Sequence, residues 1–295
     1  MLCVVDISGL LFANSYTHRN LSVGDQPTGG VYGTIKSLIE IKDEFSCPII
    51  VVWDGRSWRK DKSEEYKANR GVNQEAKELK EKVHAQTGIL KQFVDQMGFI
   101  QMQASNMEAD DLAALVVRRY KGDINLVTRD GDWLQLVNRP GIKWINVIQS
   151  REEYDFYSAK VKMKFNTVEQ FVQAKALMGD VGDNVKSVGG IGLAGAKVIM
   201  RDFGSVEKFI QDYKEGREYS WSKKFKDFLD SEEKQKRFSD NMLLVDLNDE
   251  RIPNPVDLKT KKDAINMEAF LDLCERYSFV SLIPQAERIR TILER

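Results

Sequence analysis

The first half of the chain alternates short apolar runs with longer stretches in which apolar and polar residues are mixed. The runs are rich in valine, isoleucine and leucine, and several of them end at an acidic residue. Such runs are typical of strands that are buried on both faces of a parallel sheet. The pattern predicts strands over 2–6, 48–54, 99–104 and 124–128, and an edge strand over 142–148.

The stretches between these runs carry apolar residues at the three- and four-residue spacing of amphipathic helices. We predict helices over 29–45, 74–97 and 107–120. Because strands and helices alternate, the predicted fold class is α/β, with a mostly parallel central sheet flanked by helices.

The pattern changes after residue 150. A helix is predicted over 168–178, a glycine-rich hinge follows at 188–192, and short helices are predicted for most of the remaining chain. We therefore expect an α/β core over 1–165 and a helical region over 166–295.

Composition excludes several classes of protein. The chain has 295 residues, of which 42% are hydrophobic, and this excludes a disordered protein. No apolar run approaches the roughly 20 residues that span a bilayer, and the N-terminus lacks the pattern of a signal peptide. Three widely spaced cysteines, Cys3, Cys47 and Cys274, favour a reducing cytosol, and the two histidines argue against a zinc site.

Acidic residues gather where the predicted elements end. Asp6 and Asp54 each close a strand, and the carboxyl ends of parallel strands meet at one edge of a sheet, where ligands bind. Two carboxylates there would repel each other unless a cation binds between them. For either residue alone, the simpler interpretation is an aspartate that begins a turn.

Three acids, Glu108, Asp110 and Asp111, mark the start of the helix predicted over 107–120. Ser105 and Glu108 fit a capping box, and acids in a first turn suit the helix dipole. Neither effect requires three acids. Glu108 and Asp111 would share a helix face, with Asp110 on its flank, and hard divalent cations would relieve their repulsion.

Two further pairs follow apolar elements: Asp130 with Asp132, and Asp180 with Asp183. Each pair alone is explained by a turn, and the spacing is not that of an EF-hand. Nine carboxylates without histidine, however, match a site in which two metal ions hold the attacking and leaving oxygens of a phosphate. Two Mg²⁺ ions are expected, with Mn²⁺ as the alternative.

The net charge of −1 does not by itself indicate a nucleic-acid binder. If nine of the 45 acidic residues are assigned to metal ions, the other 36 face 44 lysines and arginines. The rest of the molecule then carries a surplus of eight positive charges, which weakly favours a polyanionic partner.

A basic segment follows the second predicted strand. Most of its lysines alternate with glutamates, as in a solvated pair of helices. Tyr66, Lys67 and Arg70 stand apart from this pattern. On a helix, Lys67 and Arg70 would share a face and could hold a phosphate, and Tyr66 could stack on an unpaired base.

The glycine-rich hinge fits a helix–hairpin–helix clamp on the DNA backbone. Gly190 and Gly192 would let the chain approach phosphates closely, and the next helix, which contains Lys197, offers free N–H groups. Such contacts carry no sequence information. The alternative is a turn that only caps a helix.

The order of these motifs resembles the phage 5′-nuclease and flap endonuclease family, which is related to the 5′-nuclease domain of bacterial DNA polymerase I. The resemblance covers about residues 1–250. It comprises Val4-Val5-Asp6, Asp54, Tyr66-Lys67-Ala68-Asn69-Arg70, Glu108-Ala109-Asp110-Asp111, Thr128-Arg129-Asp130-Gly131-Asp132-Trp133, Lys175-Ala176-Leu177-Met178-Gly179-Asp180-Val181-Gly182-Asp183-Asn184, Gly190-Ile191-Gly192 and Asn241-Met242-Leu243-Leu244-Val245-Asp246-Leu247.

The resemblance implies a PIN-like nuclease core, a helical arch at about 56–97 and a helix–three-turn–helix element with its hinge at about 185–205. It also implies 5′-3′ exonuclease and structure-specific flap endonuclease activity in replication. The substrate would be DNA with a 5′ flap, a nick or a free 5′ end.

The resemblance also assigns roles by position. The first metal would be held by Asp6, Asp54, Glu108 and Asp110, and the second by Asp130, Asp132, Asp180 and Asp183, with Asp111 between them. Lys67 and Arg70 would be catalytic contacts to the scissile phosphate. DNA would contact Tyr66, Lys67, Arg70, Lys175, Gly190, Gly192 and Lys197, and K⁺ would bind carbonyl groups of the hinge. The chain departs from the family at Ala194 and Gly195, where a basic residue is usual, so Lys197 is the expected substitute.

Three alternatives remain open. An RNA-primer-removing, RNase H-like exonuclease of the same superfamily would have the same site. A catalytically degenerate DNA-junction-binding protein would need fewer acids, and a phosphatase would need an Asp-x-Asp-x-Thr motif that the sequence lacks. Length favours a phage-encoded or stand-alone enzyme, which we expect to be a cytoplasmic monomer without a membrane partner.

Overall fold

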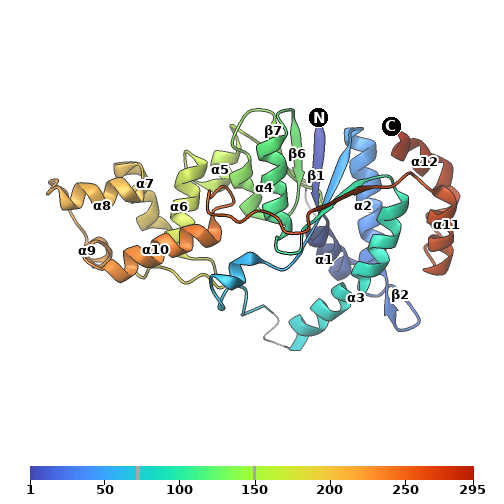
Figure 1. Ribbon diagram of the computed structural model, residues 1–295, viewed down its shortest axis with the longest axis horizontal. Helices are drawn as coiled ribbons and strands as arrows, with labels where there is room; N and C mark the ends of the chain where they lie inside the picture. The colour runs from blue at the N-terminus through green and yellow to red at the C-terminus, as the bar shows by residue number, and fades with distance from the viewer. Residues whose placement is uncertain (71–73, 149–150) are drawn as a thin grey trace.

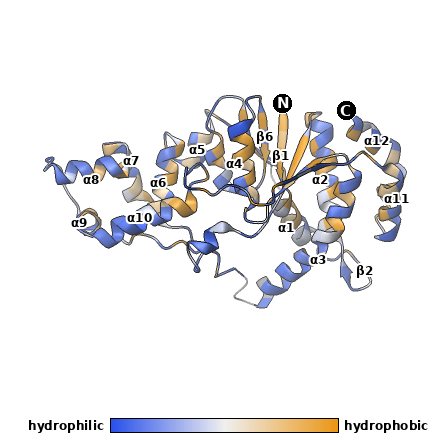
Figure 2. Cartoon of the chain, in the orientation of Figure 1, coloured by the Kyte–Doolittle hydropathy of each residue, from blue (hydrophilic) through white to orange (hydrophobic). Residues whose placement is uncertain are grey.

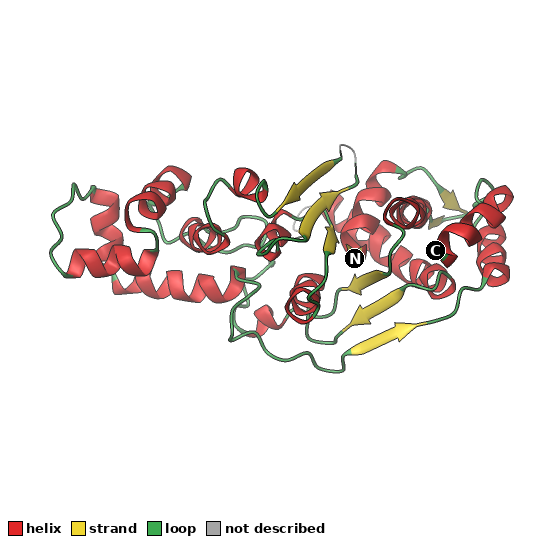
Figure 3. Cartoon of the chain, turned by 90° about the horizontal axis from the view of Figure 1, so that it is seen from above, coloured by secondary structure: helices red, strands yellow, loops and turns green. Residues whose placement is uncertain are grey.

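A seven-stranded sheet forms the centre of the computed structural model, which describes residues 1–70, 74–148 and 151–295 (Figure 3). The strand order is β8-β7-β6-β1-β4-β5-β9. The five inner strands are parallel: β1 (Leu2–Asp6), β4 (Ile49–Trp53), β5 (Ile100–Gln103), β6 (Ile124–Val127) and β7 (Ile142–Asn146). In the centre, Val4 of β1 pairs with Ile50 on one side and with Leu126 on the other. All five predicted strands are therefore present.

Short antiparallel strands cover both edges of the parallel sheet. β8 (Glu152–Asp155) pairs with β7, and β9 (Lys259–Lys262) pairs with β5. The prediction that 142–148 is an edge strand was therefore wrong. Neither covering strand has an apolar run, and the exposed lysines of β9 discourage a further chain from pairing with this edge.

Helices cover both faces of the sheet because the strand residues alternate between two hydrophobic clusters. Cys3 and Val5 pack with α1 (Ile7–Thr17), α2 (Gly29–Phe45), α3 (Gln74–Gln96), α11 (Met267–Arg276) and α12 (Ala286–Glu294). Leu2 and Val4 pack with α4 (Ala109–Arg119), the 3₁₀ helix η2 (Gly131–Leu136) and α5 (Ala159–Met163). In Figure 2 the central strands are the most hydrophobic segments, as burial on both faces requires.

The remaining elements are short. A hairpin of β2 (Ser22–Val23) and β3 (Gln26–Pro27) joins α1 to α2. Two further 3₁₀ helices are η1 (Trp58–Asp61) and η3 (Ile283–Gln285). No helix in the described part of the chain is long and apolar enough to cross a membrane.

A helical lobe extends from the core at one end of the molecule (Figure 1). It contains α6 (Val168–Met178), α7 (Leu193–Phe203), α8 (Val206–Lys214), α9 (Lys223–Leu229) and α10 (Glu232–Val245). Its separate core is aromatic: Phe203 stacks on Trp221 with ring centroids 5.6 Å apart, and Phe209 stacks on Phe228 at 6.2 Å. The lobe can therefore hold its own shape beside the sheet.

The C-terminal segment returns to the α/β core. After β9, α11 packs against α3 and α12 packs against α2, at the opposite end of the molecule from the lobe (Figure 1). The N–H of Asn266 donates to the carbonyl of Gln96 at 2.9 Å, and Tyr32 and Ser281 share a hydrogen bond of 2.8 Å. Our prediction placed all of 166–295 in one helical region, whereas residues 259–294 lie with the core.

The predicted helices over 29–45, 74–97 and 107–120 correspond to α2, α3 and α4, with small shifts at their ends. The segment 62–70, where we considered a helix, is instead a series of turns. Within the predicted arch at 56–97, residues 71–73 lie outside the described part of the chain.

Candidate active site

The carboxyl ends of the central strands open into a cleft of about 830 Å³. β1 ends at Asp6, Asp54 follows β4, and Asp130 lies shortly after β6. Because β1 pairs with both β4 and β6, neighbouring strands carry these three carboxylates into the same cleft. Glu108 and Asp110, at the start of α4, complete the acidic lining.

Asp6 is buried at the junction of β1 and α1. Its Oδ1 atom accepts a hydrogen bond of 2.8 Å from the N–H of Gly9, and its Oδ2 atom accepts one of 3.0 Å from the Thr128 hydroxyl. A β-carbon at Gly9 would lie 2.3 Å from Asp6 Oδ2, so any larger residue there would displace the Asp6 carboxylate. Burial, together with the charge of Asp54, raises the pKa of Asp6 to about 7.

The carboxylates at the start of α4, together with Asp54, are held by different hydrogen-bond donors. Asp54 Oδ1 accepts from the N–H of Ala109 at 2.8 Å, and Asp110 Oδ1 accepts from the Trp133 indole at 2.5 Å. Burial and the charge of Asp130 raise the pKa of Asp110 well above its usual range. The capping box is formed by Glu108 and Asp111, so our assignment of a box to Ser105 and Glu108 was wrong.

Asp111 does not line the cleft. Its side chain is buried, and its oxygens accept from the Arg59 guanidinium at 2.8 and 3.0 Å and from the Trp58 indole at 3.2 Å. The Arg59 side chain is only 1% exposed. Asp111 therefore fastens η1 to α4, and its oxygens are already engaged. The pairing of Arg59 with Asp111 is not evident from the sequence, because the two residues are far apart in the chain.

Lys67 lies between two carboxylates. Its Nζ atom donates to Glu108 Oε1 at 2.6 Å and lies 3.7 Å from Asp183 Oδ2. Arg70 reaches the same Asp183 at 2.6 Å and is half exposed. Lys67 and Arg70 both line the cleft. They do so from turns, with Lys67 at φ 56°, and not from one face of a helix.

Tyr66 is buried, with 3% of its surface exposed. Its hydroxyl donates to Asp183 at 2.9 Å and to Glu108 at 3.2 Å. Burial and the nearby carboxylates raise the pKa of Tyr66. The buried ring therefore packs behind Glu108 and Asp183. In this conformation it cannot stack on an unpaired base, although the sequence had suggested such stacking.

A second acidic group lies beside the cleft, at the contact between η2 and α6. Lys175 of α6 forms ion pairs with Asp132 of η2 and with Asp180, the latter at 2.8 Å. All three side chains are largely buried. Burial and Asp130 raise the pKa of Asp132 to about 6, against the lowering effect of Lys175.

The donor atoms fit hard divalent cations, because carboxylate oxygens are the ligands that Mg²⁺ and Mn²⁺ prefer. Burial, and after it a neighbouring carboxylate, raises the pKa of both Asp6 and Asp110, so a cation here would stabilise their charged forms. Among the described residues, however, no three acidic, histidine or cysteine side chains stand close enough to hold one ion as they lie. Metal binding would therefore require some of these carboxylates to move, including those now paired with lysine.

The glycine hinge joins α6 to α7. Gly190 and Gly192 are exposed, as is Lys197 on α7. A β-carbon on Gly190 would lie 3.8 Å from the Lys224 side chain, and one on Gly189 would lie 3.8 Å from that of Lys234. α7 has no lysine at position 194 or 195, but α9 and α10 place Lys224 and Lys234 beside the hinge. Neither lysine is recognisable from the sequence as a neighbour of the hinge, because both follow it by some 30 residues or more.

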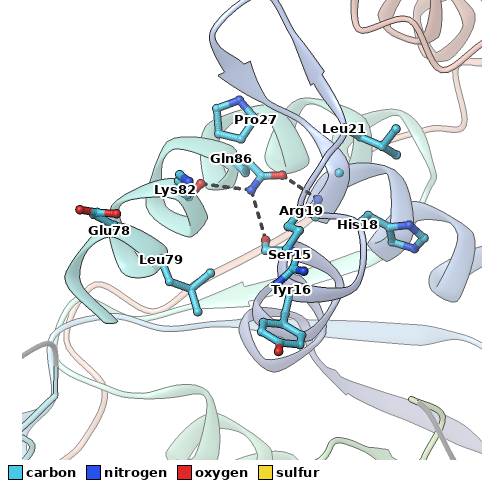
Figure 4. Close-up of a pocket in the computed structure, with 12 residues that line it drawn as sticks. Ser15, Tyr16, His18, Arg19, Leu21, Pro27, Glu78, Leu79, Lys82 and Gln86 are labelled. Atoms are coloured by element: carbon cyan, nitrogen blue, oxygen red, sulfur yellow. Dashed lines mark hydrogen bonds between the residues drawn. The ribbon is translucent and has the colours of Figure 1, made fainter. Parts of the chain in front are cut away.

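A separate pocket of about 420 Å³ lies beyond the cleft, between α1, α2 and α3 (Figure 4). Gln86 lies at its base, where its side chain accepts from the N–H of Gly30 at 2.8 Å and donates to Ser15 and to the Lys82 carbonyl. Gln86 thereby fixes α3 against the start of α2. The preceding turns of α3 lie along the cleft, which Leu79 lines.

Comparison with known proteins places the chain in a family. A family model described as "5′-3′ exonuclease, N-terminal resolvase-like domain" matches residues 1–166. The chain is 27% identical over 226 residues to the 5′-3′ exonuclease of Bacillus subtilis, covering 72% of this chain and 73% of that protein. It is 29% identical over 215 residues to the thermostable DNA polymerase I of Thermus thermophilus, covering 70% of this chain and 24% of that protein. The chain thus spans only about a quarter of the length of its polymerase relatives.

Solved structures share the fold. The T5 D15 protein co-crystallised with metal ions has a TM-score of 0.68, with 24% identity over 99% of both chains. Flap endonuclease-1 from Methanococcus jannaschii has a TM-score of 0.60, with 14% identity over 99% of this chain and 92% of that one. These structures confirm the predicted nuclease fold. Given the match over residues 1–166, which contain the cleft, the chain belongs to the 5′-3′ exonuclease family.

Proposed function

We propose that this protein hydrolyses phosphodiester bonds of DNA at free 5′ ends and 5′ flaps, as a 5′-3′ exonuclease and structure-specific flap endonuclease acting in replication. The observation that carries the proposal is the cleft itself. Five carboxylates from two strand ends, one loop and one helix start face the cations Lys67 and Arg70 across a single space. Such a surface can bind metal ions on one side and a phosphate on the other.

Divalent cations belong to the proposal, with Mg²⁺ as the expected ion and Mn²⁺ as a substitute. The first would be held by Asp6, Asp54, Glu108 and Asp110, and the second by Asp130, Asp132, Asp180 and Asp183. We leave out Asp111, whose oxygens bind Arg59. When bound, the ions would supply a nucleophile at neutral pH and stabilise the leaving oxygen.

The side chains of the protein itself would orient the substrate. Arg70 lines the cleft and is half exposed, so its guanidinium can bind phosphate oxygens once it is released from Asp183. Lys67, once released from Glu108, would stabilise the charge that develops on the scissile phosphate. Lys67→Ala should therefore slow single-turnover cleavage by about 10²-fold, and an unchanged rate would remove Lys67 from the mechanism.

DNA would also bind the helical lobe. Exposed Gly190 and Gly192 allow close approach of the backbone, and Lys197, Lys224 and Lys234 supply positive charge around the hinge. We further propose K⁺ at carbonyl groups of the hinge, by analogy with the family. The protein would act as a monomer in the bacterial cytoplasm, that of the host cell if the enzyme is phage-encoded.

The direct test is cleavage of a 5′-labelled flap duplex in Mg²⁺, with EDTA as the control. We expect products with 5′-phosphate ends near the flap junction, and no cleavage in EDTA. An RNA-primed duplex tested in parallel separates the primer-removing alternative. If neither substrate is cut although DNA binds, the protein is instead a junction binder.

A further inference from the structure

The acidic residues of the site divide into two groups according to their partners. The paired group, Glu108, Asp132, Asp180 and Asp183, forms ion pairs with Lys67, Lys175, Arg59 or Arg70. The unpaired group, Asp6, Asp54, Asp110 and Asp130, has no salt-bridge partner in the described part of the chain. A divalent cation would therefore have to displace a side-chain cation from the paired group, but not from the unpaired group.

Lys175 is the clearest case of pairing within the site. Its ammonium group touches Asp132 from η2 and Asp180 from the loop after α6, so it bridges two elements. The Lys175 side chain is 11% exposed, against 28% for Asp132 and 23% for Asp180. The ammonium group thus occupies the space between these two carboxylates, and a cation that bound both would have to displace it.

Displacement would not remove the ammonium group from the site. Lys175 lies in the last turn of α6, and the N–H of Gly179 caps that helix at the Lys175 carbonyl. The backbone position of Lys175 is therefore fixed, while four flexible methylene groups carry the charge. A freed ammonium group would remain beside the cleft, where a phosphate is the available anion.

We propose that Lys175 is an exchangeable counter-ion: it neutralises Asp132 and Asp180 in the metal-free protein and moves to a substrate phosphate oxygen when a divalent cation takes those carboxylates. The inference rests on the proposed function for its second half, the contact with phosphate. Its first half, competition with a cation, concerns the protein alone.

The exchange predicts two effects of opposite sign. Removing the ammonium group frees two carboxylates, so a divalent cation should bind more tightly. The same change removes a DNA contact, but only under conditions in which the carboxylates hold a cation. A residue that merely buttressed α6 would produce neither effect, and a fixed DNA contact would weaken binding with or without metal.

The first experiment measures Mn²⁺ binding to the full chain without DNA, by calorimetry and by electron paramagnetic resonance of free Mn²⁺. Lys175→Met should tighten binding of one ion by about tenfold. The matched control is Arg129→Met, because Arg129 lines the same cleft and is exposed, with no salt bridge among the described residues. It removes one positive charge without freeing a carboxylate, and should change the affinity less than about threefold.

Two results would overturn the first half of the proposal: unchanged or weaker Mn²⁺ binding by Lys175→Met, or an equal effect of both variants. Lys175→Arg keeps the charge and should bind Mn²⁺ much like the wild type. If Lys175→Met does not fold, as judged by circular dichroism, Lys175→Gln gives the same comparison while keeping a hydrogen-bond donor.

The second experiment measures affinity for a 5′-flap duplex in Ca²⁺ and in EDTA, for wild type and Lys175→Met. We expect the variant to bind about fivefold more weakly in Ca²⁺ and equally well in EDTA. If the ratio of wild-type to variant DNA affinity is the same in Ca²⁺ and in EDTA, the proposed movement of Lys175 to a phosphate is wrong. If no DNA binds in either buffer, the proposed function fails as well, whereas the Mn²⁺ experiment still decides the exchange.

Discussion

The unpaired and paired carboxylate groups of the active site differ in how the repulsion between their buried negative charges is balanced. Two members of the unpaired group, Asp6 and Asp54, stand at strand ends, Asp110 lies in the first turn of α4 and Asp130 precedes η2. Backbone N–H groups, a hydroxyl or an indole fix these side chains but supply no full positive charge. The paired group lies on loops and helix ends, where two lysines and two arginines neutralise it. A metal ion would therefore relieve repulsion in the first group and compete with an ammonium group in the second.

The largest expected effect is on catalysis. Asp54→Asn removes a charge from the unpaired group while keeping an acceptor for Ala109, so the fold should survive. We expect single-turnover flap cleavage in Mg²⁺ to fall by at least about 10³-fold, with DNA affinity in Ca²⁺ nearly unchanged. Asp132→Asn tests the paired group in the same assay and should also abolish cleavage. Near-normal turnover by either variant would remove that residue from the metal site.

The next largest effect concerns the acid that neither group contains. Arg59→Met leaves the buried Asp111 carboxylate without its guanidinium and also removes a longer contact, of 3.3 Å, with Glu108. The free energy of unfolding should fall by about 3–5 kcal/mol. The control is Arg56→Met, which breaks an exposed pair with Asp61 and should cost at most about 1 kcal/mol. Urea denaturation measures both. Similar losses would mean that Asp111 is no more firmly bound than a surface acid.

In the metal-free protein, replacing a carboxylate by an amide should raise the stability of the fold in the unpaired group and lower it in the paired group. Asp6 has a raised pKa, so the folded state holds its proton while the unfolded state loses it, and stability falls as the pH rises from about 4 to about 7. At pH 8 in EDTA, Asp6→Asn should therefore stabilise the protein, by on the order of 1–4 kcal/mol.

Asp180 is the matched residue of the paired group. Lys175 lowers the pKa of Asp180 despite its burial, so this carboxylate stabilises the fold above pH about 4 and loses that effect as the pH falls further. Asp180→Asn should therefore destabilise the protein at pH 8. Thermal melts of both variants in EDTA test the contrast, and shifts of the same sign would contradict the division into two groups.

The smallest expected effect lies outside both groups, at the glycine hinge. Lys224→Met should weaken DNA binding by less than about tenfold and reduce the slope of log affinity against log salt by about one. Lys226→Met on the same helix is the control, because Lys226 does not border a hinge glycine within 4 Å. Equal slopes for the two variants would mean that Lys224 contacts no phosphate.

The sequence predicted the parts of this structure that depend on local patterns. The inner strands appear as apolar runs because both faces of the sheet are covered, and α2, α3 and α4 follow from their spacing. Strand ends carrying Asp6 and Asp54 were predicted to meet because parallel strands place them side by side.

What the sequence did not reveal depends on contacts between distant segments. Asp111 resembles its neighbours Glu108 and Asp110 in sequence, and only the fold shows that Arg59 takes it away from the cleft. Tyr66 has the position of a stacking residue but is covered by the lobe and by Glu108. β9 has no apolar run at all, because it lies at an exposed edge and pairs through its backbone.

The late position of β9 has a consequence for biosynthesis. A ribosome releases the chain from its N-terminus, so β5 appears more than 150 residues before the strand that covers its edge. During that interval the nascent sheet presents an open row of peptide groups, to which other strands can pair. The helical lobe, whose aromatic core is continuous in sequence, can fold in the meantime. The nuclease core would thus be the last part of the molecule to close, and an interrupted chain would leave its sheet exposed to aggregation.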